Sequence, residues 1–382
     1  MIEIAKRLKD VKEYYFSIKL REVRSLIEKG KPIINLGIGS PDLDPPYEVI
    51  EALKNSNVHG YQNYQGIPEL RESLARFYDI NYNVTLNPVN EILPLMGSKE
   101  GILHISMAYL NEGDEVLIPN PGYPTYASVT KLVQANPVFY DLDSKNNWQP
   151  DFRALENSDL SKVKLMWVNY PHMPTGATPS DDLFKKLIAF GKKHNILIVN
   201  DNPYSFILNN NPKSILAYEG AKDIAIELNS LSKTFNMSGW RVGMVLGNSE
   251  YLNNILKVKS NMDSGMYYGI QQGAIAALNI SENWFESINK IYRKRRKVIW
   301  KICDILKCTY DEKSTGLFVW AKVPRGISSE EITDDLLYEY NVFVTPGTIF
   351  GNKGEGYIRF SLCIDELKIN EVLTRISKNQ MS

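Results

Sequence analysis

Short apolar runs alternate with helical patterns along the middle of the 382-residue chain, between about residues 67 and 300. The runs are continuous in apolar residues, which indicates strands that are buried on both faces. They read EILPLMG, EVLIP, VKLMWVNY and ILIVND, and helical patterns such as SKEGILHISMAYL and SDDLFKKLIAFGKKHN lie between them. This alternation predicts βαβ units and an α/β fold with a mostly parallel sheet flanked by helices.

The pattern changes near residue 280. A long charged helical pattern, SENWFESINKIYRKRRKVIWKICDIL, is followed by the apolar runs GLFVWAKVP, VFVTPG and GYIRFSLC. We therefore predict a large domain at 47–280 and a smaller α+β domain at 281–382, as suits a chain of this length. We expect the N-terminal segment, 1–46, to pack with the small domain, with residues 1–30 forming one amphipathic helix.

Composition argues against several classes of protein. Lys plus Arg and Asp plus Glu both total 44, so net charge draws the chain neither to nucleic acid nor to an anionic membrane. No run approaches ~20 apolar residues, and the N-terminus lacks the apolar core of a signal peptide. The three cysteines fit no metal or redox spacing, which favours reduced thiols in the cytoplasm. The four scattered histidines predict no metal site.

Polar groups follow three of the predicted strands. Gly97 and Ser98 open a helix, Asp201 ends the run ILIVND, and Lys233 lies in SLSK after a further strand. Sheets of this kind bind ligands at the carboxyl ends of their strands. We therefore expect an anion cradle, a carboxylate and an amine at one edge. Neither a dinucleotide fingerprint nor a P-loop is present.

Pyridoxal 5′-phosphate needs these three groups together. A lysine amine binds its aldehyde as a Schiff base, and an aspartate pairs with its protonated pyridine nitrogen. Backbone N–H groups, hydroxyls and an arginine fork suit its phosphate. Ser230, Ser232 and Arg241 surround Lys233 in the stretch SLSKTFNMSGWRVG and supply the hydroxyls and the fork.

The chain resembles the fold-type-I, class I/II aminotransferases, which share the aspartate-aminotransferase-like fold. The resemblance extends over nearly the whole sequence, with the motifs in the family's order: LGIGSPD, YQNYQGIPELRE, GSKEG, PNPGYPTY, NYPHMPTGA, VNDNPY, SLSKTFNMSGWRVG and GYIRFSL. It implies a pyridoxal-phosphate-dependent aminotransferase that moves an amino group between an L-amino acid and a 2-oxo acid in ping-pong half-reactions.

The same resemblance implies roles for individual residues. Lys233 would form the internal aldimine and move a proton, Asp201 would pair with the pyridine nitrogen, and Tyr204 would hydrogen-bond the cofactor's 3′ oxygen. Tyr123 would stack on the cofactor ring. The phosphate would be held by the backbone N–H groups of Ser98 and Lys99, the Ser230 hydroxyl and Arg241, with Ser232 in support.

Three further residues concern the substrate and the assembly. Arg359 would clamp the substrate's α-carboxylate, and Gly39 would let the backbone approach the substrate. Tyr61 matches a tyrosine that reaches the partner subunit's phosphate in this family, so the resemblance implies a homodimer with shared active sites.

One position departs from the family. Met173 stands where the family has the asparagine of N-P-T-G, whose amide donates to the cofactor's 3′ oxygen. A thioether is no comparable donor. His172 lies one residue earlier, but the sequence does not give the direction of its side chain.

The sequence leaves other functions and the substrate open. A C–S lyase or a decarboxylase of the same fold is the nearest alternative, and a non-catalytic sensor domain of a transcription regulator is a second. GSKEG and SLSKTFNMSGWR resemble LL-diaminopimelate aminotransferases, but similar stretches occur in alanine, methionine and aromatic aminotransferases.

Overall fold

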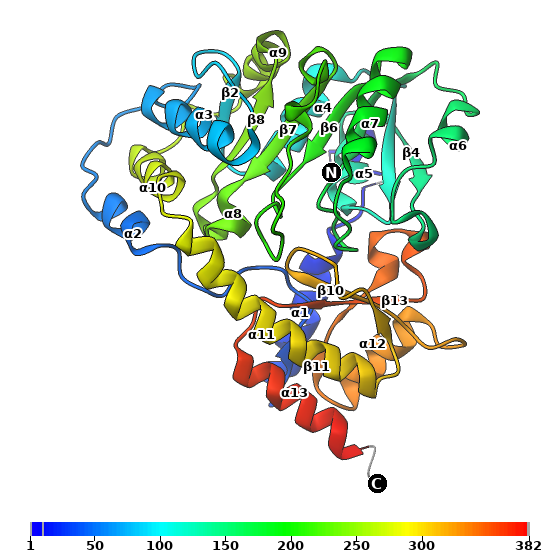
Figure 1. Ribbon diagram of the computed structural model, residues 1–382. Helices are drawn as coiled ribbons and strands as arrows, with labels where there is room; N and C mark the ends of the chain where they lie inside the picture. The colour runs from blue at the N-terminus through cyan, green and yellow to red at the C-terminus, as the bar shows by residue number, and fades with distance from the viewer. Residues whose placement is uncertain (1, 10, 380–382) are drawn as a thin grey trace.

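The computed structural model describes residues 2–9 and 11–379 and contains two packed parts. The described residues form a seven-stranded sheet, a four-stranded sheet and a two-stranded ladder. Figure 1 shows the large sheet and its helices in the upper part of the molecule, and the small sheet with further helices in the lower part.

The large sheet has the strand order β2-β8-β7-β6-β5-β3-β4. Strands β4, β3, β5, β6 and β7 run parallel, and β8 is antiparallel to both of its neighbours. The mostly parallel sheet predicted from the sequence is confirmed. The strands are β2 (Ile92–Leu95), β3 (Glu115–Asn120), β4 (Asn136–Asp141), β5 (Val163–Val168), β6 (Leu197–Asp201), β7 (Ala225–Ser230) and β8 (Gly243–Gly247).

Helices cover both faces of this sheet, which explains the continuous apolar strands. On β5, Leu165 and Trp167 face a core shared with α4, α5 and α9, whereas Met166 and Val168 face a core shared with α3, α7 and α10. The helices of this part are α2 (Tyr47–Lys54), α3 (Pro68–Tyr82), α4 (Ser98–Tyr109), α5 (Pro124–Leu132), α6 (Phe152–Glu156), α7 (Asp181–His194), α8 (Leu231–Thr234), α9 (Ser249–Lys259) and α10 (Tyr268–Leu278).

Local sequence signals set the ends of these helices. The Ser180 side chain accepts a hydrogen bond from the backbone of Leu183 at the start of α7, and Asp181 lies in the first turn. The helix ends in basic residues, and Asn195 follows in the left-handed conformation. Pro68 occupies the first turn of α3, where its missing N–H costs nothing.

The lower part contains an antiparallel sheet in the order β12-β13-β10-β9. Its elements are β9 (Thr309–Tyr310), β10 (Phe318–Lys322), β12 (Thr345–Pro346), β13 (Tyr357–Ser361), α11 (Asn283–Ile305), α12 (Ser329–Tyr338) and α13 (Glu366–Asn379). The apolar run VFVTPG forms two short strands in different sheets, β11 (Val342–Phe343) and β12.

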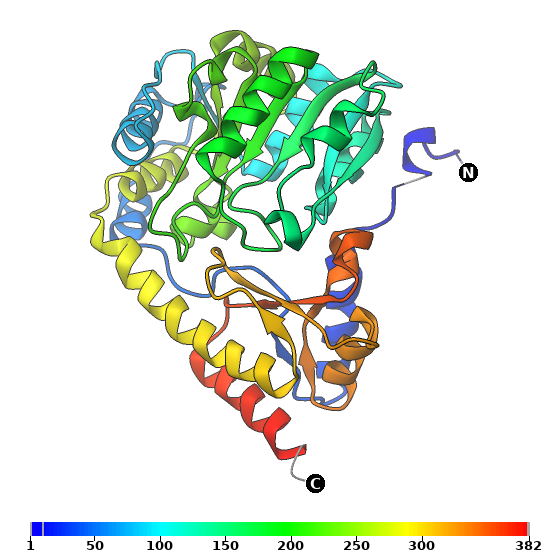
Figure 2. The ribbon, with the colours of Figure 1, turned by 45° about the vertical axis from the view of Figure 1, so that its right-hand side comes forward.

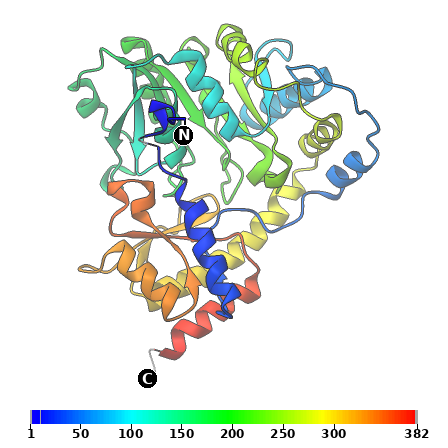
Figure 3. The ribbon, with the colours of Figure 1, turned by 180° about the vertical axis from the view of Figure 1, so that it is seen from behind.

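Residues 15–35 of the N-terminal segment pack on the lower part. Helix α1 (Tyr15–Glu28) buries Phe16 and Val23 against it, and β1 (Ile34–Asn35) pairs in parallel with β11. Figure 3 shows α1 running along the lower part, and Figure 2 shows residues 2–9 beside the upper part.

The helix predicted over residues 1–30 is wrong in its first half. The side chains of residues 2–9 are all exposed, so no buried apolar face stabilises an amphipathic helix there. The domain boundaries at 46 and 280 stay a prediction.

Short 3₁₀ turns connect the main elements at η1 (Lys6–Leu8), η2 (Ser144–Asn146), η3 (Ile215–Ala217), η4 (Ala221–Asp223), η5 (Ser238–Trp240), η6 (Gly347–Phe350) and η7 (Asn352–Gly354). Among the described residues, none of the helices has the length and apolar character needed to cross a bilayer.

Candidate active site

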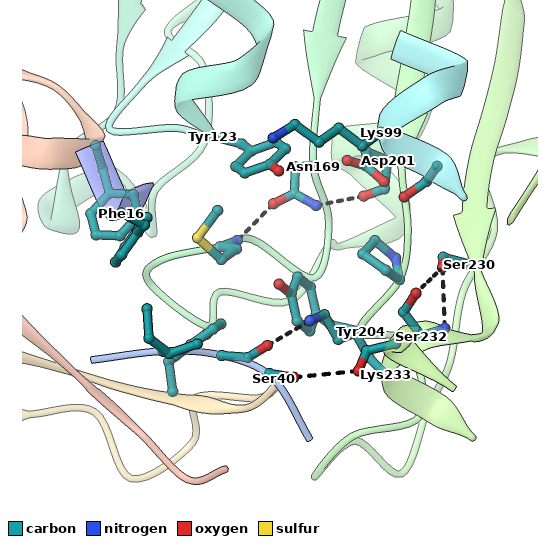
Figure 4. Close-up of a pocket in the computed structure, with 18 of the residues that line it drawn as sticks. Phe16, Ser40, Lys99, Tyr123, Asn169, Asp201, Tyr204, Ser230, Ser232 and Lys233 are labelled. Atoms are coloured by element: carbon teal, nitrogen blue, oxygen red, sulfur yellow. Dashed lines mark hydrogen bonds between the residues drawn. The ribbon is translucent and has the colours of Figure 1, made fainter. Parts of the chain in front are cut away.

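A cavity of about 550 Å³ lies between the carboxyl edge of the large sheet and the lower part. Figure 4 shows Lys233, Tyr204, Asp201 and Tyr123 around the same space. The cavity brings together all but one of the residues predicted for the site: Gly39, Ser98, Lys99, Tyr123, Met173, Asp201, Tyr204, Ser230, Ser232, Lys233, Arg241 and Arg359.

Lys233 supplies an amine inside this cavity. It lies on the short helix α8, directly after β7, and its Nζ donates to the carbonyl oxygen of Gly39 over 2.5 Å. Burial lowers the pKa of this ammonium. The described residues place no ion pair on Lys233, so no carboxylate offsets this effect, and the neutral, nucleophilic form is favoured.

Asp201 supplies a buried carboxylate at the end of β6. One oxygen, Oδ2, accepts from the Tyr126 hydroxyl over 2.8 Å, while Oδ1 is buried without a partner in the described part of the chain. Burial raises the pKa of Asp201 to about 7 despite that hydrogen bond. The unpartnered oxygen suits a cationic N–H group of a bound ligand.

The N-terminus of α4 forms an anion cradle next to Arg241. Gly97 precedes the helix with φ +93, and a Cβ there would lie 2.1 Å from the Arg241 Nη2. A Cβ on Gly243 would lie 2.5 Å from the backbone nitrogen of Ser98. These two glycines let a helix N-terminus and a guanidinium approach each other, which is an arrangement suited to phosphate.

Hydroxyl groups complete the cradle. The Ser230 side chain caps α8 by accepting from the backbone N–H of Ser232, and the two serine hydroxyls lie 2.8 Å apart. The Lys99 ammonium lies 4.4 Å from the centre of the Tyr14 ring, and burial, with Arg241 nearby, lowers its pKa.

Arg359, on β13, brings a further cation to the lining of the cavity. Its side chain is buried, with the residue 4% exposed, and the rings of Phe318, Phe350 and Phe16 lie 3.9, 4.6 and 5.5 Å from its Cζ. Burial lowers the pKa of Arg359 to about 10, so it stays charged at neutral pH. The described residues place no carboxylate against it, so an incoming carboxylate would find an uncompensated charge.

Tyr204 and Tyr123 line the cavity as expected. Burial raises the pKa of the Tyr204 hydroxyl, which therefore keeps its proton and can donate. The structure shows why position 39 is a glycine: a Cβ there would lie 2.2 Å from the Phe318 ring. The sequence did not reveal this contact.

The structure shows where the side chains of His172 and Met173 point. His172 points away from the cavity: its Nδ1 lies 2.8 Å from the Thr175 hydroxyl, and burial lowers its pKa to about 3. It does not replace the missing asparagine as a donor. Met173 lines the cavity, and its sulfur contacts Arg359.

Tyr61 lies outside the cavity and is 92% exposed. Its role across a subunit interface stays a prediction.

Several lining residues were not predicted from the sequence. Asn169 directly follows β5, so the strand-end rule that selected Asp201 also pointed to it; its amide donates to the Asp201 carbonyl oxygen over 2.5 Å. Tyr126 lies one helical turn after Tyr123. No local signal marks the cavity residues of α1, which come from a distant segment. The lining residues that were not predicted include Tyr14, Phe16, Leu20, Tyr126, Asn169 and Phe350.

Comparison with known proteins agrees with this geometry. The family model for aminotransferase class I and II matches residues 31–376. A protein named LL-diaminopimelate aminotransferase, from Aquifex aeolicus, is 39% identical, with 98% of this chain and 99% of that protein covered. A solved structure described as apo-BacF from Bacillus subtilis is 36% identical with a TM-score of 0.94, over 99% of this chain and 98% of that one.

The chain belongs to the class I and II aminotransferases. Its fold is that of aspartate aminotransferase, since a mutant of the Thermus thermophilus enzyme superposes with a TM-score of 0.91 at 24% identity, over 99% of this chain and 100% of that one. Membership of this family confirms the predicted activity, which is amino-group transfer between an amino acid and a 2-oxo acid. The comparisons do not favour a lyase, a decarboxylase or a sensor domain.

Proposed function

We propose that this aminotransferase works with pyridoxal 5′-phosphate bound in the cavity at Lys233. One observation carries the proposal: an amine, an unpartnered buried carboxylate oxygen and an anion cradle line the same cavity. When bound, the cofactor supplies a carbonyl carbon that takes up the amino group and a ring that withdraws electrons from the substrate.

The chain's own residues fit this cofactor. Asp201 Oδ1 would accept from the pyridine N–H, which satisfies the buried oxygen and keeps the carboxylate ionised. Tyr204 would donate to the 3′ oxygen, and Tyr123 would lie against the ring. The phosphate would be held at the start of α4 by Ser98, Lys99, Ser230, Ser232 and Arg241.

Lys233 has two tasks in this proposal. Its amine would hold the cofactor before substrate arrives, and its Nζ would later move a proton at the substrate's Cα. The lowered pKa favours the unprotonated amine, which is the form that can accept this proton. Arg359 would bind the α-carboxylate and so orient the Cα toward Lys233.

We further propose a homodimer, in which Tyr61 of each chain completes the partner's site. Exposed apolar side chains occur in two segments, 47–64 and 262–267. These segments are neighbours in space, because a Cβ on Gly265 would lie 2.5 Å from the Gln62 carbonyl oxygen. Cytoplasmic localisation stays part of the proposal, supported by three buried cysteines that form no disulfide in the described residues.

The test is a single half-reaction. The purified enzyme with its cofactor is mixed with one amino donor at a time, and the oxo acid released per active site is measured. LL-Diaminopimelate is the first donor to test because the Aquifex aeolicus relative is named LL-diaminopimelate aminotransferase. We expect one oxo acid per site from at least one donor. Release of ammonia or carbon dioxide instead would contradict the proposal.

Lys233→Ala should abolish this half-reaction, whereas the exposed-lysine control Lys257→Ala should leave it unchanged. Full turnover by Lys233→Ala would refute the assignment of the amine.

A further inference from the structure

Met173 lies against the cation of the substrate site. Its sulfur is 3.3 Å from the Arg359 Nη1, and the residue is only 6% exposed. Its backbone N–H donates to the Asn169 Oδ1 over 2.8 Å, and the Asn169 amide in turn donates to the Asp201 carbonyl oxygen. The main chain at Met173 is therefore anchored to the end of β6, while its side chain extends to the guanidinium.

Few groups fix the position of Arg359. A guanidinium has five N–H donors. Nη2 donates to the Gly37 carbonyl oxygen over 2.8 Å, Nη1 contacts the Met173 sulfur, and Nε is buried without a partner in the described residues. The surrounding aromatic rings attract the cation but accept no hydrogen bond in a fixed direction. Among the residues that the structure describes, the sulfur is thus one of two acceptors that orient the planar group.

We propose that Met173 is a positioning residue for the substrate carboxylate: its thioether orients the Arg359 guanidinium and so sets the affinity for amino and oxo acids alike. The proposal rests on the proposed role of Arg359 as the carboxylate clamp. It differs from the expectation for the family's asparagine at this place, which concerns the cofactor's 3′ oxygen.

The sulfur suits this task chemically. A thioether accepts a hydrogen bond weakly and donates none, so it orients the guanidinium without neutralising its charge. A carboxylate at the same place would pair with Arg359 and compete with the substrate. An apolar side chain of the same volume would keep the packing but lose the acceptor.

The test is Met173→Leu, which conserves volume, with Met166→Leu as the matched control. Met166 is a buried methionine on β5 outside the cavity. We expect the KM values of the amino donor and of the oxo acceptor to rise together by about three- to tenfold in Met173→Leu, with kcat changed by less than about twofold. Cofactor affinity and the pH midpoint of cofactor absorbance should not move. The Met166→Leu control should leave both KM values, kcat, the cofactor affinity and the absorbance midpoint unchanged.

A double-mutant cycle separates action through Arg359 from a general disturbance. In an Arg359→Lys background the guanidinium is absent, so adding Met173→Leu should raise the KM values by less than about twofold. Equal effects in both backgrounds, a shift in the absorbance midpoint, or a change in KM for one substrate alone would overturn the proposal. If Arg359→Lys itself leaves both KM values unchanged, the clamp assignment fails first, and this proposal fails with it.

Discussion

Arg359 is a buried cation that the described residues leave without a carboxylate partner, which is costly unless a ligand supplies one. Arg359→Lys keeps the charge but loses the planar fork. We expect KM for amino and oxo acids to rise by about 10- to 100-fold, as the loss of one charge-assisted hydrogen bond implies. Steady-state kinetics with both substrates check this. A rise for one substrate only would make Arg359 a selector of side chains instead.

Asp201 gives the cofactor-free protein a distinctive pH dependence. Its pKa rises from 3.8 to about 7 on burial, so the folded state binds this proton more tightly than the unfolded state. The contribution of Asp201 to the free energy of unfolding is therefore fully present below about pH 4 and is lost as the pH rises through 7. The loss is on the order of 4 kcal/mol.

The Asp201→Asn variant removes this titration. We expect the Tm of the cofactor-free native protein, measured relative to that variant, to fall between pH 4.5 and pH 7.5. Added pyridoxal phosphate should reverse most of the loss in the native protein, because its ring nitrogen pairs with the carboxylate. A pH-independent difference in Tm would show that Asp201 does not titrate in this range.

At the scale of elements, the start of α4 is the part of the site most dependent on backbone geometry. Gly97→Ala would put a Cβ into the Arg241 guanidinium and strain a residue at φ +93. We expect the affinity for pyridoxal phosphate to fall by at least tenfold, with little change for pyridoxal, which lacks the phosphate.

Gly113→Ala is the matched control, since Gly113 has φ +86 but nothing within 4 Å of its Cβ position. It carries similar backbone strain without touching the cradle. Equal losses of affinity for both forms of the cofactor in Gly97→Ala would mean that α4 does not hold the phosphate.

Strand ends were the part of the site that sequence could predict. Asp201 ends one buried apolar run and Lys233 follows another. Parallel strands bring their carboxyl ends to one edge of the sheet. The contribution of α1 was beyond local patterns, because Phe16 reaches the cavity only through packing on the lower part. The roles of His172 and Met173 depended on side-chain direction, which spacing does not give.

At the scale of the whole molecule, Tyr61 predicts that two chains share each site. Inactive Lys233→Ala and inactive Tyr61→Ala proteins, mixed and allowed to exchange subunits, should form heterodimers with one site carrying both lesions and one carrying neither. Random exchange should restore about a quarter of native activity. Heterodimers that form without any recovery would refute shared sites.

Covalent trapping shows whether Lys233 holds the cofactor. The native enzyme loaded with pyridoxal phosphate is reduced with borohydride, digested and analysed by mass spectrometry, with Lys233→Ala treated in parallel. We expect one phosphopyridoxyl group per chain, on the peptide that contains Lys233, and none above background in the variant. A stoichiometric adduct on another lysine, or an equal adduct in Lys233→Ala, would show that Lys233 does not hold the cofactor.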